Sequence, residues 1–324
     1  MTRILVTGGA GFIGSHLVDG LLRQSHAVRV LDDFSTGKHE NLAHCRGDIE
    51  LIEGDIRDVA VVEGAVRGVT AIFHEAAIAS VPLSFEDPAL ANEVNVGGTV
   101  NLLQSARRHS VALLALASSC AVYGDQETLP IGEDAPLRPG SPYAASKAAG
   151  EAYCAAFAGS GGPRTVCFRY FNVFGPRQDP SSAYSGVIAR FMDCALSGTA
   201  YPLEGDGAQT RDFIYVADIV EANVLALSDE ADYGAGPQPQ VLNLGTGAET
   251  NLLQIIHALD GLTGRSGAVR HLPPRDGDIA RSLADVERAR CALGFEARAS
   301  FAEGLAATVA WARRAAVPPA TSSP

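Results

Sequence analysis

The chain has 324 residues, of which 47% are hydrophobic and 19% charged, a composition typical of a folded globular enzyme and unlike that of disordered proteins. This length permits one large α/β unit or two unequal lobes, each with a substantial core. The formal net charge of -12 and the lack of a Lys/Arg cluster argue against a nucleic-acid partner.

The first half of the chain alternates short apolar, β-rich runs with longer helical stretches. Strands are predicted at 3–7, 28–31, 51–53, 71–74, 111–117 and 164–170. This rhythm indicates a parallel sheet, and right-handed crossovers then make a doubly wound α/β fold the simplest topology. Ligands of such folds bind beyond the carboxyl ends of the strands.

After residue 170 the pattern loosens into loops rich in Gly and Pro, such as G-P-R-Q-D-P at 175–180 and Y-P-L-E-G-D-G at 201–207. Long irregular segments in a compact enzyme usually line a site. We therefore expect a Rossmann-type nucleotide-binding domain at 1–170. A smaller, discontinuous substrate lobe is expected at 171–316, and some of its segments return to the first domain. Residues 317–324 are expected to be a disordered tail.

A dinucleotide site is predicted where the first strand runs into G-G-A-G-F-I-G, which places Gly8, Gly11 and Gly14 at a turn and in the first coil of a helix. Without side chains the backbone can approach a pyrophosphate, which the helix N-terminus stabilises. Three glycines could also form nothing more than a tight turn. However, the second strand ends in Asp32 and Asp33, close to the spacing of about 20 residues expected for a ribose partner. A carboxylate there would repel a 2′-phosphate, so NAD is favoured over NADP.

A catalytic group is predicted in S-P-Y-A-A-S-K, where Tyr143 and Lys147 lie four residues apart and so share one helix face. A nearby ammonium and a positive nicotinamide both favour a phenolate, so Tyr143 is the candidate general base. An isolated pair of this kind is usually an ordinary surface pair. Here Ser118 and Ser119 come directly after a predicted strand, where a doubly wound sheet places reactive groups, and Ser119 would bind a sugar oxygen. Capping of the strand end is the alternative role for the two serines.

Several further motifs accompany these residues: E-G-D-I-R-D at 53–58, H-E-A-A at 74–77, N-V-G-G-T at 95–99, S-S-C-A-V-Y-G at 118–124, R-Y-F-N-V-F-G-P-R at 169–177 and R-D-F-I-Y-V at 211–216. Together they resemble the extended short-chain dehydrogenase/reductase family, and within it the UDP-sugar 4-epimerases, over nearly the whole chain. The resemblance implies a tightly bound NAD that is regenerated in each turnover, and a UDP-sugar substrate.

By position, the resemblance implies that Asp55 and Ile56 flank the adenine and that Ala76 and Ala77 line the cofactor channel. Asn95 and Phe171 are expected to seat the nicotinamide half. The full expected cofactor set is Gly8, Gly11, Phe12, Ile13, Gly14, Asp32, Asp33, Asp55, Ile56, Ala76, Ala77, Asn95, Tyr143, Lys147 and Phe171.

For the substrate, the resemblance implies that Asn172 meets the phosphates, that Arg211 and Arg275 clamp the diphosphate, and that Asp278 holds the uridine ribose. The full expected substrate set is Ser119, Asn172, Val187, Arg211, Arg275, Asp278 and Ser282.

The two residues after Ser119 narrow the reaction. Related nucleotide-sugar dehydratases carry an Asp-Glu pair at the positions of Cys120 and Ala121, and related decarboxylases usually carry Glu in place of Ala121. A 4-epimerase needs only Ser119, Tyr143, Lys147 and NAD, and Cys120 is interpreted as a packing residue. The predicted function is therefore a UDP-sugar 4-epimerase. The alternatives are a uronate epimerase, a dehydratase, a decarboxylase or a non-catalytic dinucleotide-binding regulator.

The sugar is predicted from Ser282, which aligns with a family position that can hold a bulky Tyr and narrow the sugar pocket. A small residue there should admit an N-acetyl group, and the phrase F-G-P-R-Q-D-P-S-S-A-Y-S-G-V-I resembles members that prefer UDP-N-acetylhexosamines. UDP-GlcNAc/UDP-GalNAc is favoured over UDP-glucose/UDP-galactose. A homodimer is expected from the family, through helices around 92–109 and 143–157.

No signal peptide is expected, because the N-terminus enters an apolar strand within three residues, and no apolar run approaches the ~18 residues that cross a bilayer. The six cysteines include no C-x-x-C pair, and the eight histidines show no H-E-x-x-H or similar spacing. We therefore expect a cytoplasmic protein with reduced thiols, no metal and no membrane partner.

Overall fold

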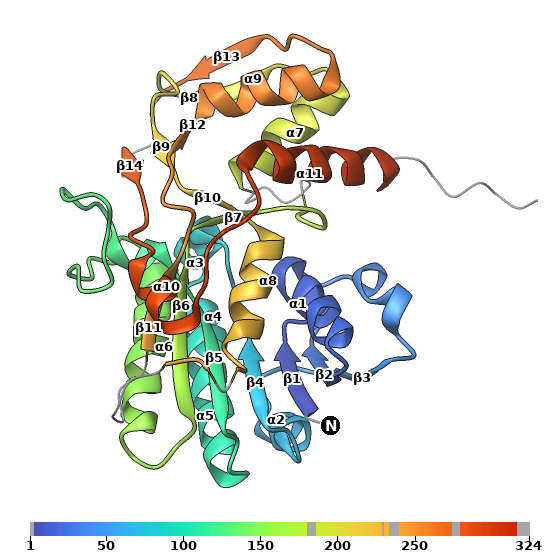
Figure 1. Ribbon diagram of the computed structural model, residues 1–324, viewed down its shortest axis with the longest axis vertical. Helices are drawn as coiled ribbons and strands as arrows, with labels where there is room; N and C mark the ends of the chain where they lie inside the picture. Colours follow the sequence, from blue (N-terminus) through green and yellow to red (C-terminus); the bar gives the residue numbers. More distant parts are fainter. Residues whose placement is uncertain (1–2, 180–185, 229, 233–239, 274–278, 316–324) are drawn as a thin grey trace, which may run out of the picture.

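A parallel sheet forms the centre of the molecule (Figure 1). The computed structural model describes residues 3–179, 186–228, 230–232, 240–273 and 279–315. In this part of the chain the strand order is β11-β6-β5-β4-β1-β2-β3, and every neighbouring pair is parallel. The strands are β1 (Arg3–Thr7), β2 (Ala27–Asp32), β3 (Ile49–Glu53), β4 (Ala71–His74), β5 (Leu113–Ser119), β6 (Arg164–Tyr170) and β11 (Gln240–Leu244). The predicted doubly wound α/β fold is confirmed, with its switch point between β1 and β4.

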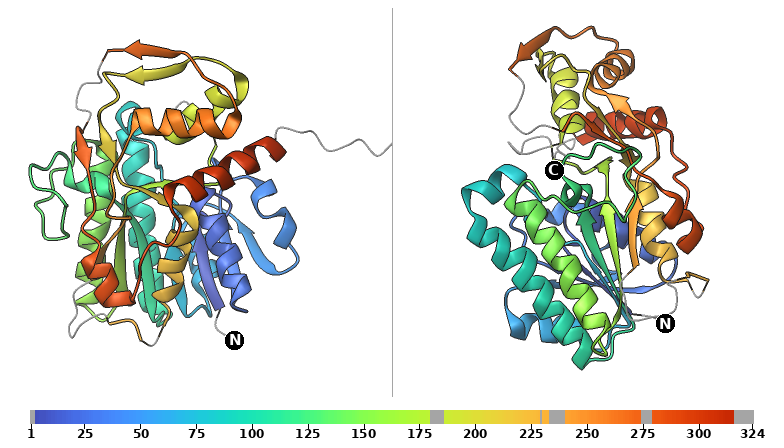
Figure 2. Two further views of the ribbon diagram at one scale, coloured as in Figure 1. Left: turned by 45° about the horizontal axis from the view of Figure 1, so that its top comes forward. Right: turned by 90° about the vertical axis from the view of Figure 1, so that its left-hand side faces the viewer.

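Helices cover both faces of this sheet, as the edge-on view in Figure 2 shows. One face carries α1 (Phe12–Arg23), α8 (Val216–Leu225) and α10 (Glu287–Leu293), and the other α2 (Val59–Val66), α5 (Thr99–Arg108) and α6 (Pro142–Ala158). In β1, Ile4 and Val6 belong to the first apolar core and Leu5 to the second, and all three are fully buried. Burial on both faces explains why the strands are almost continuously apolar.

A second group of elements lies beyond the carboxyl ends of the sheet strands, at the top of Figure 1. It consists of α7 (Val187–Ser197), β8 (Tyr201–Glu204), α9 (Leu252–Thr263), β13 (Val269–Leu272) and α11 (Phe301–Ala315). These elements have a core of their own, which includes Phe191, Tyr201 and Leu305. In contrast, β11, α8 and α10 come from the second half of the chain and pack into the sheet unit.

Short elements join the two groups. They form two small sheets. In one, β7 (Asn172–Phe174) pairs with β10 (Phe213–Tyr215). In the other, β12 (Thr250–Asn251) and β14 (Arg281–Ser282) lie on either side of β9 (Thr210–Arg211). The remaining short elements are two α-helices, α3 (Val81–Glu86) and α4 (Pro88–Asn92), and a π-helical turn, η3 (Glu93–Gly98). Three further turns are 3-10 helical: η1 (His39–Asn41), η2 (Ala43–Cys45) and η4 (Cys120–Tyr123). Within the described ranges, no helix has both the length and the apolar character to cross a membrane.

The strand before the candidate serines differs from its prediction. The sequence pattern predicts it at 111–117, but it runs from Leu113 to Ser119. Val111 belongs to the turn that follows α5, because its N–H donates to the carbonyl of Ala106, and Ser110 takes a left-handed φ of 54° to make that turn. Ser119 is therefore the last residue of a buried strand.

Candidate active site

A cavity of about 310 Å³ opens at the carboxyl ends of β1, β2 and β4. This is the edge at which a doubly wound sheet binds its ligands. The cavity brings together a large part of the expected cofactor set: Gly8, Gly11, Phe12, Ile13, Gly14, Asp32, Asp33, Asp55, Ile56, Ala76 and Ala77.

Two glycines give the cavity its floor. Gly8 has a φ of +68°, and a Cβ there would lie 2.6 Å from the backbone nitrogen of Ala76. A Cβ on Gly14 would lie 2.1 Å from the carbonyl oxygen of Gly8, so no side chain fits at either position. Helix α1 begins at Phe12, and its N-terminal N–H groups offer an anion site. This backbone cradle fits the pyrophosphate of a dinucleotide.

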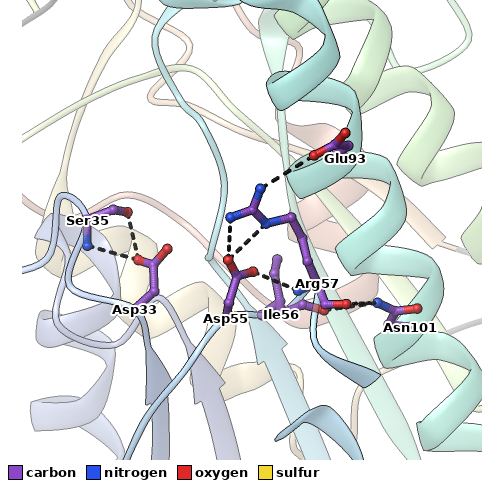
Figure 3. Close-up of polar contacts among 7 residues, drawn as sticks. All are labelled: Asp33, Ser35, Asp55, Ile56, Arg57, Glu93 and Asn101. Atoms are coloured by element: carbon purple, nitrogen blue, oxygen red, sulfur yellow. Dashed lines mark hydrogen bonds and ion pairs between the residues drawn. The ribbon is translucent and has the colours of Figure 1, made fainter. Parts of the chain in front are cut away.

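The acidic pair after β2 is held in place by nearby backbone groups. The buried Asp32 carboxylate accepts hydrogen bonds from the N–H of Ala10 at 2.8 Å and of Phe34 at 2.9 Å. Burial raises the pKa of Asp32, and these two bonds oppose the rise. Asp33 accepts from the N–H of Ser35 at 3.0 Å and from its hydroxyl at 2.6 Å (Figure 3). Both carboxylates line the cavity, where they fit ribose hydroxyls and oppose a 2′-phosphate.

The cavity wall expected to contact the adenine is held by ion pairs among Asp55, Arg57 and Glu93 (Figure 3). Arg57 donates to Oδ2 of Asp55 from Nε at 2.8 Å and from Nη2 at 2.6 Å, and it reaches Glu93 at 3.4 Å. The hydrogen bond from Arg57 is the main reason why the pKa of Asp55 is lowered. The amide of Asn101 donates to the carbonyl of Ile56 at 3.1 Å. The wall at residues 55–57 is therefore held from several directions.

Four residues of the expected cofactor set are not among those that line this cavity: Asn95, Tyr143, Lys147 and Phe171. Asn95 is buried in the π-helical turn, where its Oδ1 accepts from the N–H of Ile78 at 2.7 Å and its Nδ2 donates to Ser146 at 2.9 Å. It thus links the cavity wall to α6. Phe171 is buried with Tyr123, at a ring-centroid separation of 6.5 Å.

The three expected catalytic side chains converge at the end of β5. Ser141 caps α6 by accepting a hydrogen bond from the N–H of Ala144 at 3.1 Å, so the helix places Tyr143 in its first turn and Lys147 one turn later. The Tyr143 phenol shares a hydrogen bond with Ser119. The ammonium of Lys147 donates to the carbonyl of Ala117 at 2.7 Å and lies 5.9 Å from the centroid of the Tyr143 ring.

Burial dominates the protonation of this group. It raises the pKa of Tyr143 to about 12, although the bond to Ser119 opposes the shift. Burial also lowers the pKa of Lys147 to about 8. The lowering of the phenol pKa expected from the ammonium is therefore not seen here, and the phenol keeps its proton. Next to the cavity, His74 hydrogen-bonds to Thr7 and Thr99, and burial lowers its pKa to about 3, so it is a neutral structural residue.

Of the expected substrate residues that the structure describes, Ser119 ends β5, Val187 lies in the second group, and Asn172, Arg211 and Ser282 lie on the elements joining the two groups. Asn172 opens β7 and Val187 opens α7. Arg211 in β9 pairs with Ser282 in β14, and the Cys120 thiol hydrogen-bonds to Ser282. Burial raises the pKa of Cys120 to about 11, which agrees with its interpretation as a packing residue rather than a nucleophile. The expected ligands Arg275 and Asp278 lie outside the described residues.

The cavity is also lined by residues that the sequence patterns did not predict as cofactor-binding: Leu31, Ser35, Thr36, Gly37, Lys38, Asn41, Gly54, Glu75, Ile78, Ala79, Val94, Arg177 and Asp179. Most are neighbours of predicted residues, but Arg177 and Asp179 belong to a loop that the sequence assigns to the substrate lobe. That loop folds back onto the cofactor side. Arg177 pairs with Asp19 on α1 at 2.8 Å, and Lys38 pairs with Asp179 at 2.7 Å.

One group of side chains has the composition of a metal site. Donor atoms of Asp19, His44 and Cys45 lie within 4.8 Å of one another. However, the Asp19 carboxylate is already paired with Arg177 at 2.8 Å and with His44 at 2.7 Å. Burial raises the pKa of Cys45, so its thiol stays neutral. These contacts describe an ion-pair network.

Comparison with known proteins is consistent with this geometry. Residues 4–245 match the model of the NAD dependent epimerase/dehydratase family. The UDP-glucose 4-epimerase of Mycolicibacterium smegmatis is 41% identical over 320 residues, which cover 96% of this chain and 98% of that protein. The UDP-N-acetylglucosamine 4-epimerase of Methanobrevibacter ruminantium, in complex with UDP-N-acetylmuramic acid, has a TM-score of 0.91 at 37% identity, covering 97% of this chain and 99% of that one. The Thermus thermophilus UDP-glucose 4-epimerase in complex with NAD has a TM-score of 0.87 at 41% identity, covering 98% and 100%.

Proposed function

Because this chain belongs to the NAD-dependent epimerase/dehydratase family, with NAD as its cofactor, we propose that it interconverts UDP-sugars that differ in configuration at C4. One observation carries the proposal. Ser119, Tyr143 and Lys147 meet at the carboxyl end of β5, on the sheet edge at which the dinucleotide cavity opens, while the two positions after Ser119 hold Cys120 and Ala121 and no carboxylate pair for elimination. The site is equipped to oxidise and re-reduce an alcohol, and at the two positions after Ser119 it lacks the carboxylates that would remove water.

NAD, when bound, supplies the acceptor and then the donor of hydride at C4. In the proposed mechanism the Tyr143 oxygen takes the proton of the C4 hydroxyl and later returns it, while Ser119 orients that oxygen. Lys147 supplies the cationic charge that, together with the oxidised nicotinamide, lowers the phenol pKa from its high resting value. Asn172 and Arg211 are proposed to hold the diphosphate, so that only the sugar ring turns between the two hydride transfers.

The direct test is to incubate the purified protein, without added cofactor, with UDP-GlcNAc and separately with UDP-glucose, and to monitor the sugar proton NMR signals. Formation of the C4 epimer is expected. A dehydrated or decarboxylated product would replace the proposal with elimination or decarboxylation. Lack of turnover even with added NAD would favour a non-catalytic dinucleotide-binding protein.

We further propose that the preferred sugars carry an N-acetyl group. The proposal rests on Ser282, a small residue that pairs with Arg211 and contacts Cys120 next to the catalytic serine. A compact side chain at this place leaves room beside the sugar.

Ser282→Tyr should therefore lower kcat/KM for UDP-GlcNAc by roughly 100-fold, in line with a cost of about 1–3 kcal/mol for overfilling a formed site. UDP-glucose should retain its rate within a few-fold, because it has no N-acetyl group to displace. Ser282→Ala is the matched control and should leave both substrates unchanged. Equal losses for both substrates, with a normal melting temperature, would contradict this assignment.

A homodimer is also proposed, through the face that carries α5 and α6 (Figure 2). Tyr153 on α6 is 42% exposed, and Phe85 on the neighbouring α3 is 61% exposed, so large apolar groups are available there. Light scattering coupled to size exclusion should give twice the chain mass of 33.7 kDa. Tyr153→Asp should shift the protein toward the monomer, and a wild-type monomer at micromolar concentration would reject the interface.

A further inference from the structure

Glu75 is a carboxylate in the cavity wall to which the proposed mechanism gives no role. It comes directly after β4, and its side chain is partly exposed to the cavity. The hydroxyl of Tyr170, at the end of β6, donates to Oε1 of Glu75 at 2.8 Å. The amide of Asn223 on α8 donates in turn to the Tyr170 oxygen at 2.9 Å and is itself buried. Two neighbouring elements therefore fix the position of this carboxylate.

Among the residues that the structure describes, Lys147 is the charged group that acts on Glu75. From α6, Lys147 lowers the pKa of Glu75, while Glu75 raises the pKa values of both Lys147 and Tyr143. On its own strand, His74 is neutral, because burial lowers its pKa to about 3. From β6, Tyr170 is neutral as well, because burial holds its pKa well above the ordinary value.

A second acidic residue on α6, Glu151, also acts on Lys147. Its carboxylate, however, forms an ion pair with the guanidinium of Arg169 at 2.7 Å. Of the two described carboxylates whose charge acts on Lys147, Glu75 is the one that lines the dinucleotide cavity, and its charge also acts on the Tyr143 phenol.

We propose that Glu75 sets the redox balance of the bound dinucleotide by favouring its oxidised form, so that the resting enzyme is ready to accept hydride. The oxidised nicotinamide carries a positive charge and the reduced one does not. A fixed carboxylate in the same low-dielectric cavity therefore stabilises the oxidised ring. This inference rests on the NAD site of the proposed function and not on the identity of the sugar.

The test compares the wild-type holoenzyme with Glu75→Gln, each equilibrated with an external two-electron redox couple. The readout is the absorbance of the reduced nicotinamide, without any sugar nucleotide. Glutamine keeps an oxygen that can accept from Tyr170 and removes only the charge. At pH 8 the variant should hold about tenfold more reduced relative to oxidised dinucleotide, equal to roughly 30 mV for a two-electron couple.

The difference should depend on pH in a defined direction. Burial raises the pKa of Glu75 to about 7, so the carboxylate is charged above this pH and neutral below it. The two proteins should therefore differ at pH 8 and converge as the pH falls to 6. Tyr170→Phe keeps the carboxylate but removes a hydrogen bond that lowers its pKa, so convergence with Glu75→Gln should occur at higher pH.

Equal redox balances of wild type and Glu75→Gln at pH 8 would overturn the inference, and so would a difference that does not change with pH. Thermal melting of each variant checks that its fold is intact. Because no sugar nucleotide is present, a protein that binds NAD but fails to epimerise would still give a clear result. Failure of this inference and failure of the proposed function are thus separable.

Discussion

Replacing Tyr143 with phenylalanine will lower kcat for UDP-sugar epimerisation by about a thousandfold, while NAD remains bound. The expected size is that of losing a positioned general acid–base group. The variant keeps the ring near the Lys147 ammonium, 5.9 Å from the centroid, and removes only the oxygen that shares a hydrogen bond with Ser119. The measurement is kcat by the NMR assay, with the dinucleotide content read from absorbance after denaturation.

Tyr153 on the same helix gives a matched control, because its side chain is 42% exposed and lies away from the cavity lining. Tyr153→Phe should leave kcat unchanged. If Tyr143→Phe retained full activity with its normal complement of NAD, Tyr143 would not be the proton-transfer group, and the enzymatic interpretation would lose its central residue.

The second large effect is expected on stability, from Arg169→Met. The Arg169 and Glu151 side chains are only 5% and 7% exposed and form an ion pair, with Nε to Oε1 at 2.9 Å and Nη2 to Oε2 at 2.7 Å. Ser118 also donates to Glu151 at 2.5 Å, and Arg169 donates to Tyr123 at 2.9 Å. Removing the guanidinium leaves the buried Glu151 carboxylate without its counter-charge, so the free energy of unfolding should fall by about 3–5 kcal/mol. Chemical denaturation would measure it.

Two controls distinguish whether the loss of stability comes from the unpaired buried charge or from lost packing. The double variant Glu151→Met, Arg169→Met buries no charge and should be less destabilised than the single variant. Arg290→Met breaks the exposed pair with Glu287 and should leave the free energy of unfolding unchanged within error. A double variant at least as unstable as Arg169→Met would show that packing, and not an unpaired charge, causes the loss.

The sequence is most informative where a motif is local. The strands predicted at 3–7, 71–74 and 164–170 coincide with β1, β4 and β6, because continuous apolar runs fix buried parallel strands. The glycine turn, Asp32 and the Tyr143–Lys147 pair also come from short segments whose geometry depends on spacing alone.

The features that the sequence could not provide depend on contacts between distant segments. Glu75 stands inside the motif H-E-A-A, but its role depends on Tyr170 and Asn223, which reach it from other elements. Asn95 is expected from the sequence to seat the nicotinamide half, and in the structure its amide, carried by a π-helical turn, bonds to Ile78 and Ser146. Spacing along a helix does not reveal such a turn, nor which neighbour a side chain finds.

The loop that carries Arg177 and Asp179 bears on the rate at which a bound dinucleotide leaves. Arg177 and Asp179 line the dinucleotide cavity and form ion pairs with Asp19 and Lys38, respectively. Two ion pairs therefore hold this loop to the dinucleotide side of the sheet. Because both ion pairs must open before the loop can move away, we expect the loop to slow the release of a bound dinucleotide.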